Sequence, residues 1–357
     1  MKLHIRPATS WCLLAGLLVT LAASGAQAAS TIYRDEIYLR GQEDKPIVTS
    51  ITADTIKEIK AGGAVFNPLG VLRVVYSGAP QGYRNAEAHR ESGRFEEALT
   101  GYQTTLRNLT DKDRKFWLEP HCRYYIAECY LEMGDLARAE AAYTELLDKH
   151  PDTRFKPDAM MGRGRVNYEA GNFAAAERRF DDLEVFAAKA SWPVWLYEAY
   201  GWKARCLRKQ KAYSKALDYV RKVIVAPPRK YEDIITLART EEALIYVDQG
   251  EYDKAAGLLN KQIDRIAPSV DKGARFARME AQCKNALGNC YLKRFEKSKD
   301  KKDLQEALIG FLWNVTLHVG LPERTEALTK AAACFEQLGQ KTRAVELRDE
   351  LQGKEPK

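Results

Sequence analysis

Pairs of small residues recur along most of this chain at a nearly constant separation, and this repeat limits what the chain can fold into. The first members of the seven pairs are Ala86, Ala127, Gly164, Ala204, Ala243, Gly288 and Ala332. In every unit except that of Gly288, an alanine follows twelve residues later. Two helices that pack closely need a small residue on each at the point of contact. The spacing therefore predicts seven helical hairpins, which must stack on one another because none can bury its apolar face alone.

Turn and filler residues fit the same pattern. In five units a glycine lies seven residues after the first small residue, where it would end the first helix in the left-handed conformation. These glycines are Gly93, Gly134, Gly171, Gly250 and Gly339, and the fourth unit has Lys211 instead. Four residues after the second small residue there is usually a bulky apolar one, such as Tyr143 or Phe180. Such a residue would fill the space beside the helix contact.

The segment CRYYIAECYLEMGDLARAEAAYTELLDKHP, residues 122–151, shows the whole pattern and ends on a proline. It resembles the tetratricopeptide repeat family, and the resemblance extends over about residues 80–352. It implies a mainly α-helical solenoid of about seven units, which we assign to residues 79–352. The unit starts are 37 to 45 residues apart, against about 34 in the family. We therefore expect longer helices or links, especially at residues 186–195 and 267–276.

Residues 293–302 contain six basic residues, and the repeat explains where they belong. Gly288 is followed by its matching alanine, Ala307, after nineteen residues instead of twelve. The stretch RFEKSKDKK, residues 294–302, is then an insertion of seven at the hairpin turn. We expect a solvated loop there. A contact site for an acidic partner or a membrane surface is the alternative, and a nucleic-acid site is the least favoured.

Residues 30–78 differ from the repeats, because β-branched residues alternate with polar ones between glycines. We expect a small all-β domain of four or five strands. It resembles the Sm-like or SH3-like domains that precede such repeats in some exported bacterial proteins. About fifty residues make a marginal core, so this domain should lean on the first repeat.

The first residues have the plan of a secretory signal peptide, which we place at residues 1–28. Lys2 and Arg6 precede an apolar stretch, and small residues end at Ala28. The remaining chain is expected in the periplasm or cell envelope, without a membrane span. Removing two basic residues and no acidic one lowers the net charge from +7 to +5, which does not favour nucleic acid as a partner. Residues 353–357 are expected to be a disordered tail.

No motif for catalysis, a metal or a cofactor is present in the sequence, so we expect a protein that is not an enzyme. Four histidines follow residue 28, and none has a cysteine or carboxylate at metal-ligand spacing. Six cysteines follow it too. The favoured interpretation is that they are small buried residues between helices, and a disulfide between repeats is the alternative.

The resemblance also implies where a partner would bind. In this family the first helices of successive units line a concave groove that often holds a peptide. Carried onto this chain, the groove residues are Tyr83, Arg90, Tyr124, Glu128, Arg165, Tyr168, Arg205, Arg208, Asn285 and Asn289. The middle units would give a basic, aromatic groove suited to an acidic or aromatic peptide. The alternative is a solvated inner surface on which the arginines pair with nearby glutamates.

These observations predict an adaptor or scaffold that binds a protein or peptide in the cell envelope. One alternative is an envelope-assembly component whose specificity lies in the β-domain, and another is an enzyme accessory subunit. The sequence leaves self-association open.

Overall fold

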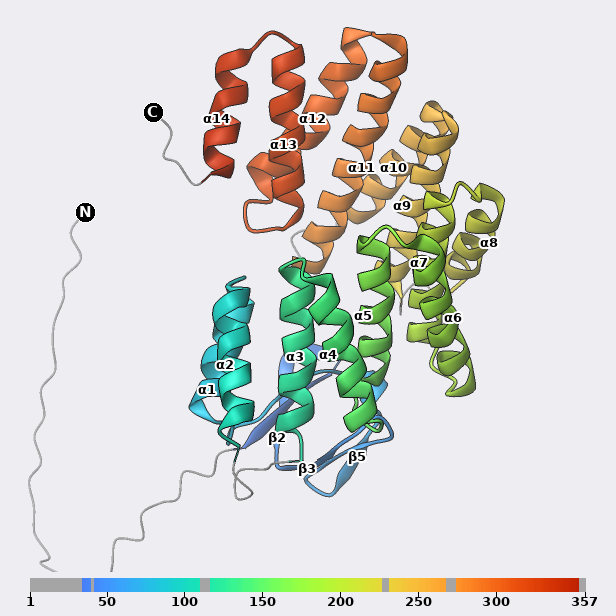
Figure 1. Cartoon of the computed structure of the whole chain (residues 1–357). Coiled ribbons are helices and arrows are strands. Elements are labelled where there is room, and N and C mark those ends of the chain that lie inside the picture. Colours follow the sequence, from blue (N-terminus) through green and yellow to red (C-terminus); the bar gives the residue numbers. More distant parts are fainter. Residues whose placement is uncertain (1–33, 40–41, 110–115, 227–230, 268–273, 353–357) are drawn as a thin grey trace, which may run out of the picture.

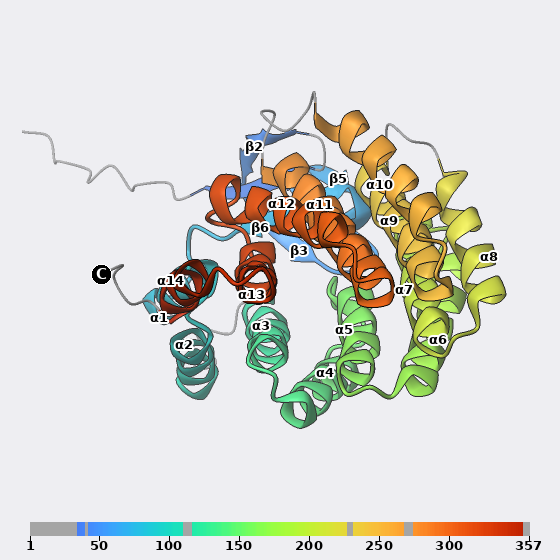
Figure 2. The same ribbon diagram turned by 90° about the horizontal axis from the view of Figure 1, so that it is seen from above.

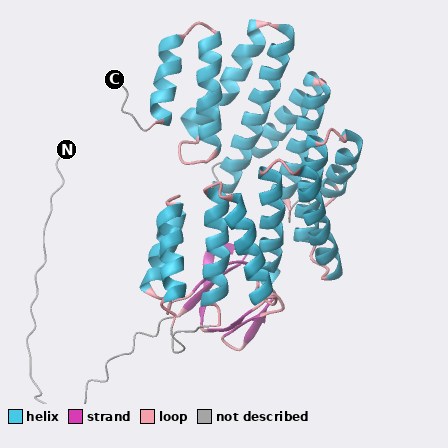
Figure 3. Cartoon of the chain, in the orientation of Figure 1, coloured by secondary structure: helices cyan, strands magenta, loops and turns pink. Residues whose placement is uncertain are grey.

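The computed structural model describes residues 34–39, 42–109, 116–226, 231–267 and 274–352. The expected signal peptide, residues 1–28, and the expected tail, residues 353–357, lie outside these ranges. A small β region precedes a long array of helices (Figure 1, Figure 3). None of the helices in the described ranges combines the length and apolar composition that a membrane span requires.

The described residues of the β region contain six short strands. They are β1 (Asp35–Leu39), β2 (Gln42–Thr49), β3 (Ile51–Asp54), β4 (Ile59–Ala61), β5 (Ala64–Phe66) and β6 (Val71–Val75). All their pairings are antiparallel, and they form two three-stranded sheets in the orders β2-β1-β6 and β3-β4-β5. The expected small β-domain is confirmed, with six strands in place of four or five.

Seven helical hairpins follow in the part of the chain that the structure describes, as the spacing of small residues predicts. Their helices are α1 (Gln81–Glu91), α2 (Phe95–Arg107), α3 (Leu118–Glu132), α4 (Leu136–Lys149), α5 (Lys156–Glu169), α6 (Phe173–Lys189), α7 (Pro193–Lys209), α8 (Tyr213–Ile224), α9 (Glu232–Gln249), α10 (Tyr252–Ile266), α11 (Ala274–Ser298), α12 (Lys301–Leu317), α13 (Glu323–Gln337) and α14 (Lys341–Leu351). Each consecutive pair is one repeat, so the solenoid prediction is confirmed.

The small residues lie where the two helices of a hairpin meet. Ala127 on α3 and Ala139 on α4 are both fully buried. In the third unit the ring of Phe180, also fully buried, lies against Gly164, where a methyl group would overlap the ring. Such contacts leave no room for a larger residue, which explains why the sequence keeps small residues at this position.

The helical array curves back on itself. Seen from above, the first helices of the repeats face the inside of the curve, and α13 and α14 come to lie over α1 and α3 (Figures 1 and 2). The outer face of α14 is almost entirely polar, as a terminal repeat requires for solubility.

All six cysteines in the described ranges are free and buried, which confirms that they fill the space between helices. Burial raises the pKa of Cys206 to about 12 and that of Cys290 to about 11. These thiols stay protonated near neutral pH and are poor nucleophiles.

The five turn glycines have positive φ angles, between 71° and 80°, as predicted. In the fourth unit Lys211 occupies the same position with a φ of 62°. A side chain in this conformation costs about 1–2 kcal/mol, because Cβ crowds the backbone.

Replacing Lys211 with glycine is therefore expected to raise the free energy of unfolding by about 0.5–1 kcal/mol, after the larger chain entropy of glycine is counted. Urea denaturation measures the change. Lys209→Gly is the matched control, because Lys209 lies in the last turn of α7 and glycine there should cost about 1 kcal/mol. If both changes destabilise equally, the left-handed strain at Lys211 is refuted.

The lysine-rich insertion differs from the expected loop. Residues 293–298 continue α11, and α12 begins at Lys301, so only Lys299 and Asp300 form the turn. Lysine and glutamate are good helix formers, and Lys293 pairs with Glu296 one turn later at 2.7 Å. The insertion thus lengthens two helices, and its residues beyond Phe295 up to Lys302 are still exposed.

The β-domain packs directly on the repeats. A single hydrophobic cluster runs from Ile37 and Ile59 in the sheets to Tyr102 and Trp117 in the first two hairpins. The backbone N–H of Ile56 donates to the carbonyl of Asp152, at 2.9 Å, in the link between α4 and α5. The expectation that the domain leans on the first repeat is confirmed, and its contacts reach the second and third.

A buried polar network lies inside this interface. Asp54 of β3 accepts hydrogen bonds from Tyr76, at 2.7 Å, and from His121 of α3, at 3.0 Å. The guanidinium of Arg154 lies 3.1 Å from the same carboxylate. Burial disfavours the charged carboxylate, but Arg154 and His121 hold the pKa of Asp54 below its usual value. The network joins the β-domain to the solenoid with fixed geometry.

The His121 ring predicts a pH dependence of stability. Burial lowers the pKa of His121 below its usual value, so the folded protein keeps the ring neutral. Its Nε2–H then donates to Asp54, and its Nδ1 accepts from the Tyr83 hydroxyl at 3.3 Å.

Between that lowered pKa and about 6.5 the unfolded chain binds more protons, so stability is present above pH 6.5 and falls with pH below it. We expect the urea midpoint to drop between pH 7.5 and pH 5, and His121→Gln to flatten the dependence. An unchanged slope in this variant would contradict a buried neutral His121.

Candidate functional site

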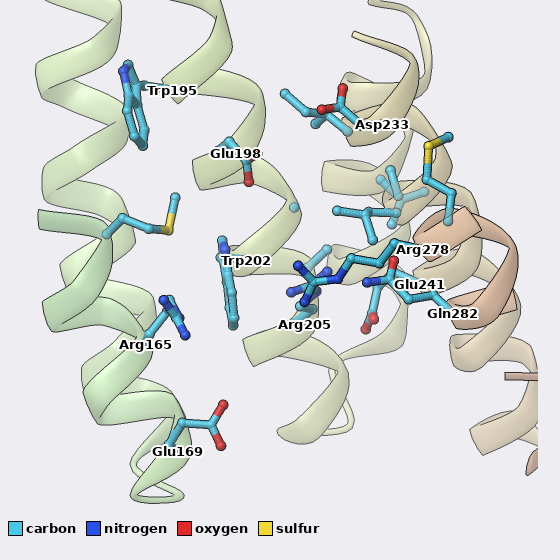
Figure 4. A pocket seen from close by; sticks show the side chains of 18 of the residues that line it. Arg165, Glu169, Trp195, Glu198, Trp202, Arg205, Asp233, Glu241, Arg278 and Gln282 are labelled. Atoms are coloured by element: carbon cyan, nitrogen blue, oxygen red, sulfur yellow. The ribbon is translucent and has the colours of Figure 1, made fainter. Parts of the chain in front are cut away.

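A cavity on the inner face lies between the first helices of four successive repeats. It has a volume of about 780 Å³ and is lined mainly from α5, α7, α9 and α11 (Figure 4). Met161, Ile234, Ala238 and Met279 give it an apolar floor, and all four are at least nine-tenths buried. The helix α11 belongs to the sixth unit, three units after α5. The two helices line one cavity because the solenoid curves.

Two tryptophans of α7 form an aromatic wall in this cavity. Trp195 and Trp202 lie two helical turns apart and point into it (Figure 4). The position of Trp202 is fixed by two aromatic contacts. Its ring stacks on that of Phe180 and packs edge-on against that of Tyr168, each with 5.5 Å between ring centroids. The guanidinium of Arg205 lies 4.4 Å from the centre of the Trp202 ring. The wall is thus fixed by the packing of the third and fourth units.

Charged side chains of both signs surround the wall. Three arginines line the cavity, together with the five carboxylates of Glu132, Glu169, Glu198, Asp233 and Glu241. The prediction of a basic groove needs correction, since carboxylates outnumber guanidinium groups. The aromatic part of the prediction holds, but with tryptophans instead of tyrosines lining the cavity.

Most arginines near the cavity have acidic partners. Arg165 lies 3.2 Å from Glu132, and Arg278 lies 2.9 Å from Glu323. Arg208 does not line the cavity itself, but it is bound at 2.5 Å to Glu241, which does. For these three, the alternative of arginines paired with glutamates is what the structure shows.

Arg205 differs from its neighbours. Among the described residues no carboxylate lies within ion-pair distance of its guanidinium, and its side chain is half-buried. It lines the cavity with its charge held over the Trp202 face. A guanidinium placed in this way presents several N–H donors to a ligand.

Two of the expected groove residues are internal, which corrects their assignment. Tyr83 is 7% exposed, packs edge-on against Trp117 at 5.3 Å and supports the β-domain. Asn285 is 3% exposed, and it donates to the backbone carbonyl of Glu323 at 2.9 Å and accepts from Asn314 at 2.6 Å. Both side chains are used for packing between elements.

The remaining expected residues lie near the inner face, outside the cavity. Arg90 is bound to Glu87 at 3.1 Å, and Tyr124 stacks on Phe155 at 4.3 Å. Burial raises the pKa of Glu128, which accepts a hydrogen bond from Tyr143. Asn289 donates to Glu326 at 3.2 Å. Of the ten expected residues, only Arg165 and Arg205 therefore line this cavity.

The sequence interpretation missed Trp195, Trp202 and Arg278. For α7 a signal exists, since residues 195, 198, 202 and 205 follow one another at three- or four-residue steps and share a helix face. For Arg278 no local signal exists, because only the curvature of the array carries α11 to the cavity.

Comparison with known proteins identifies the repeats. Residues 124–191 match the family model described as tetratricopeptide repeat. The same seam of small and bulky residues continues through the other hairpins. Residues 124–191 are therefore tetratricopeptide repeats. No curated protein matches the sequence of the chain.

Solved structures with similar architecture share little sequence with this chain. A tetratricopeptide repeat protein from Parabacteroides merdae is 14% identical, with 77% of this chain and 93% of the other covered and a TM-score of 0.50. NprR in complex with its cognate peptide NprX is 16% identical, with 75% and 74% covered and a TM-score of 0.46. PilW, a type IV pilus biogenesis factor, is 16% identical, with 70% and 100% covered and a TM-score of 0.45. At these identities the likeness shows the fold alone.

Proposed function

We propose that this protein is a non-enzymatic interaction scaffold that holds a segment of a partner protein in the cavity between α5, α7, α9 and α11. The observation that carries the proposal is the Trp195–Trp202 wall beside Arg205, whose guanidinium has no ionic partner among the described residues. A cavity of about 780 Å³ accommodates a few side chains, not a folded domain. Tetratricopeptide repeats are in general interaction modules, which fits this use.

The cavity also supports a chemistry for the bound segment. An apolar or aromatic side chain would lie against the tryptophan rings, since aromatic pairs gain more than their buried area alone. One carboxylate nearby would pair bidentately with Arg205. Glu169 and Glu198 line the same cavity, so a wholly acidic segment would be repelled. We therefore propose an aromatic or apolar residue next to a single carboxylate.

We also propose that the protein acts outside the cytoplasmic membrane, in the periplasm or cell envelope. The charged start, apolar stretch and small residues of residues 1–28 support export to the periplasm or cell envelope. N-terminal sequencing of the protein isolated from its native cells tests this. A first residue at Ala29 supports export, and an intact start at Met1 contradicts it.

The binding proposal is tested with peptides selected from a random phage-displayed library against residues 29–357. Trp202→Ala and Arg205→Glu are each expected to weaken the selected peptides at least tenfold, because central aromatic and arginine contacts dominate such interfaces. Arg178→Glu is the matched control, since Arg178 is exposed on α6 and does not line the cavity. Peptides that bind all variants equally would place recognition elsewhere, and a selection without binders would contradict the proposal.

A further inference from the structure

The strand β5 forms an edge of the sheet β3-β4-β5. It is joined to β4 by a two-residue turn in which Gly62 and Gly63 both have positive φ, and Ala61 faces Ala64 while Lys60 faces Val65. In such a hairpin the pair next to the turn exchanges hydrogen bonds, and the following pair does not. The N–H and carbonyl of Val65 therefore point away from β4, and within the described residues no hydrogen bond joins them to another element.

An apolar groove runs beside this edge. It has a volume of about 640 Å³ and lies between the β-domain and the end of α6. Its apolar lining consists of Ile56, Val65, Phe66, Phe186, Ala190 and Trp192. The side chain of Val65 is 63% exposed. A strand edge next to an apolar groove is the arrangement that proteins use for strand addition, in which the backbone gives affinity and the groove selects side chains.

Two lysines, Lys57 and Lys156, lie in or next to the groove. Lys57 is the one charged residue in its lining, and its side chain is 78% exposed with a weak 4.0 Å contact to the exposed Asp152. Such an exposed pair is worth little, so Lys57 is available to a ligand. The ammonium of Lys156 lies 5.5 Å from the centre of the Phe186 ring. A bound segment with a carboxylate would complement this rim.

We propose that β5 and this groove bind an extended segment of a partner protein as an added strand. The segment would pair its backbone with Val65, place alternate apolar side chains against Phe66, Phe186 and Trp192, and direct a carboxylate to Lys57. This site lies on the β-domain side of the molecule and uses none of the residues that line the cavity of α5, α7, α9 and α11. An experiment can therefore refute one of the two proposed sites without affecting the other.

The test uses a fluorescein-labelled heptapeptide in which valine, phenylalanine and valine alternate with threonine between terminal glutamates. Anisotropy gives its affinity for residues 29–357, and amide exchange by NMR follows Val65. We expect binding with slowed exchange at Val65. N-methylation of the central peptide amide should lower the affinity up to about tenfold, because the hydrogen bond that this amide donates to the Val65 carbonyl is lost.

Val65→Pro should have the same tenfold effect, since it removes the outward donor and leaves the bonds to β4 in place. Lys57→Glu changes only a side chain, keeps the fold and should weaken binding severalfold, so it decides the matter if the proline variant does not fold. Arg205→Glu should have no effect. No binding at millimolar peptide, equal binding by Lys57→Glu, or loss of binding in Arg205→Glu would overturn the proposal.

Discussion

Asp54→Ala is expected to lower the free energy of unfolding by about 3–5 kcal/mol, because it leaves a buried charge without its partner. Asp54 is 7% exposed, and its carboxylate lies 3.1 Å from the Arg154 guanidinium, whose side chain is 11% exposed. Without the carboxylate, Tyr76 and His121 lose their acceptor as well. The change weakens the contact between the β-domain and the first three repeats, so both the β-domain and the repeats should be less stable.

Urea denaturation measures this change, with circular dichroism following the helices. Asp152→Ala is the matched control, because the pair of Asp152 with Lys57 is 4.0 Å long and exposed and should contribute at most about 1 kcal/mol. If Asp54→Ala also costs less than about 1 kcal/mol, the network does not hold the two parts together.

Phe180→Ala is expected to cost about 3–5 kcal/mol, since it removes a fully buried ring and leaves a cavity. Phe180 lies against Gly164 within the third hairpin and stacks on Trp202 of the next one. The change should therefore weaken peptide binding in the cavity of α5, α7, α9 and α11 too, because the tryptophan wall loses its support. Val185→Ala on the same helix is the control, since Val185 is 68% exposed.

The same contact allows a compensation test. Gly164→Ala should cost about 1–3 kcal/mol by overpacking the ring. Combined with Phe180→Leu, which makes room, the loss should be smaller than the sum of the two single changes. Strict additivity in thermal or urea denaturation would show that the two residues do not meet in the seam.

The hairpins could be predicted from the sequence because their determinants are local. Ala127, Gly134 and Ala139 lie within a dozen residues of each other, and each has a steric role that few other residues fill. The prediction of a loop at the lysine-rich insertion is wrong, because a polar composition fits a solvated loop and an exposed helix equally well.

The two features that organise the molecule depend on distant residues. Asp54 and His121 are 67 positions apart, and Arg154 is 100 positions from Asp54. No spacing in the sequence therefore predicts their network. The cavity also depends on distant residues, because α5 and α11 can line it together only when the whole array has curved. Helix faces such as that of Trp195, Trp202 and Arg205 are predictable, whereas which faces converge is not.

Binding in the inner cavity is tested most directly by a ¹H–¹⁵N NMR spectrum of the tryptophan indoles with and without a selected peptide. We expect the indole signals of Trp195 and Trp202 to shift on binding. Those of Trp117, which is 2% exposed in the core, and Trp313, on α12, should stay in place. Binding that leaves Trp195 and Trp202 unchanged, or that shifts Trp313 instead, would contradict the claim that the inner cavity holds the partner.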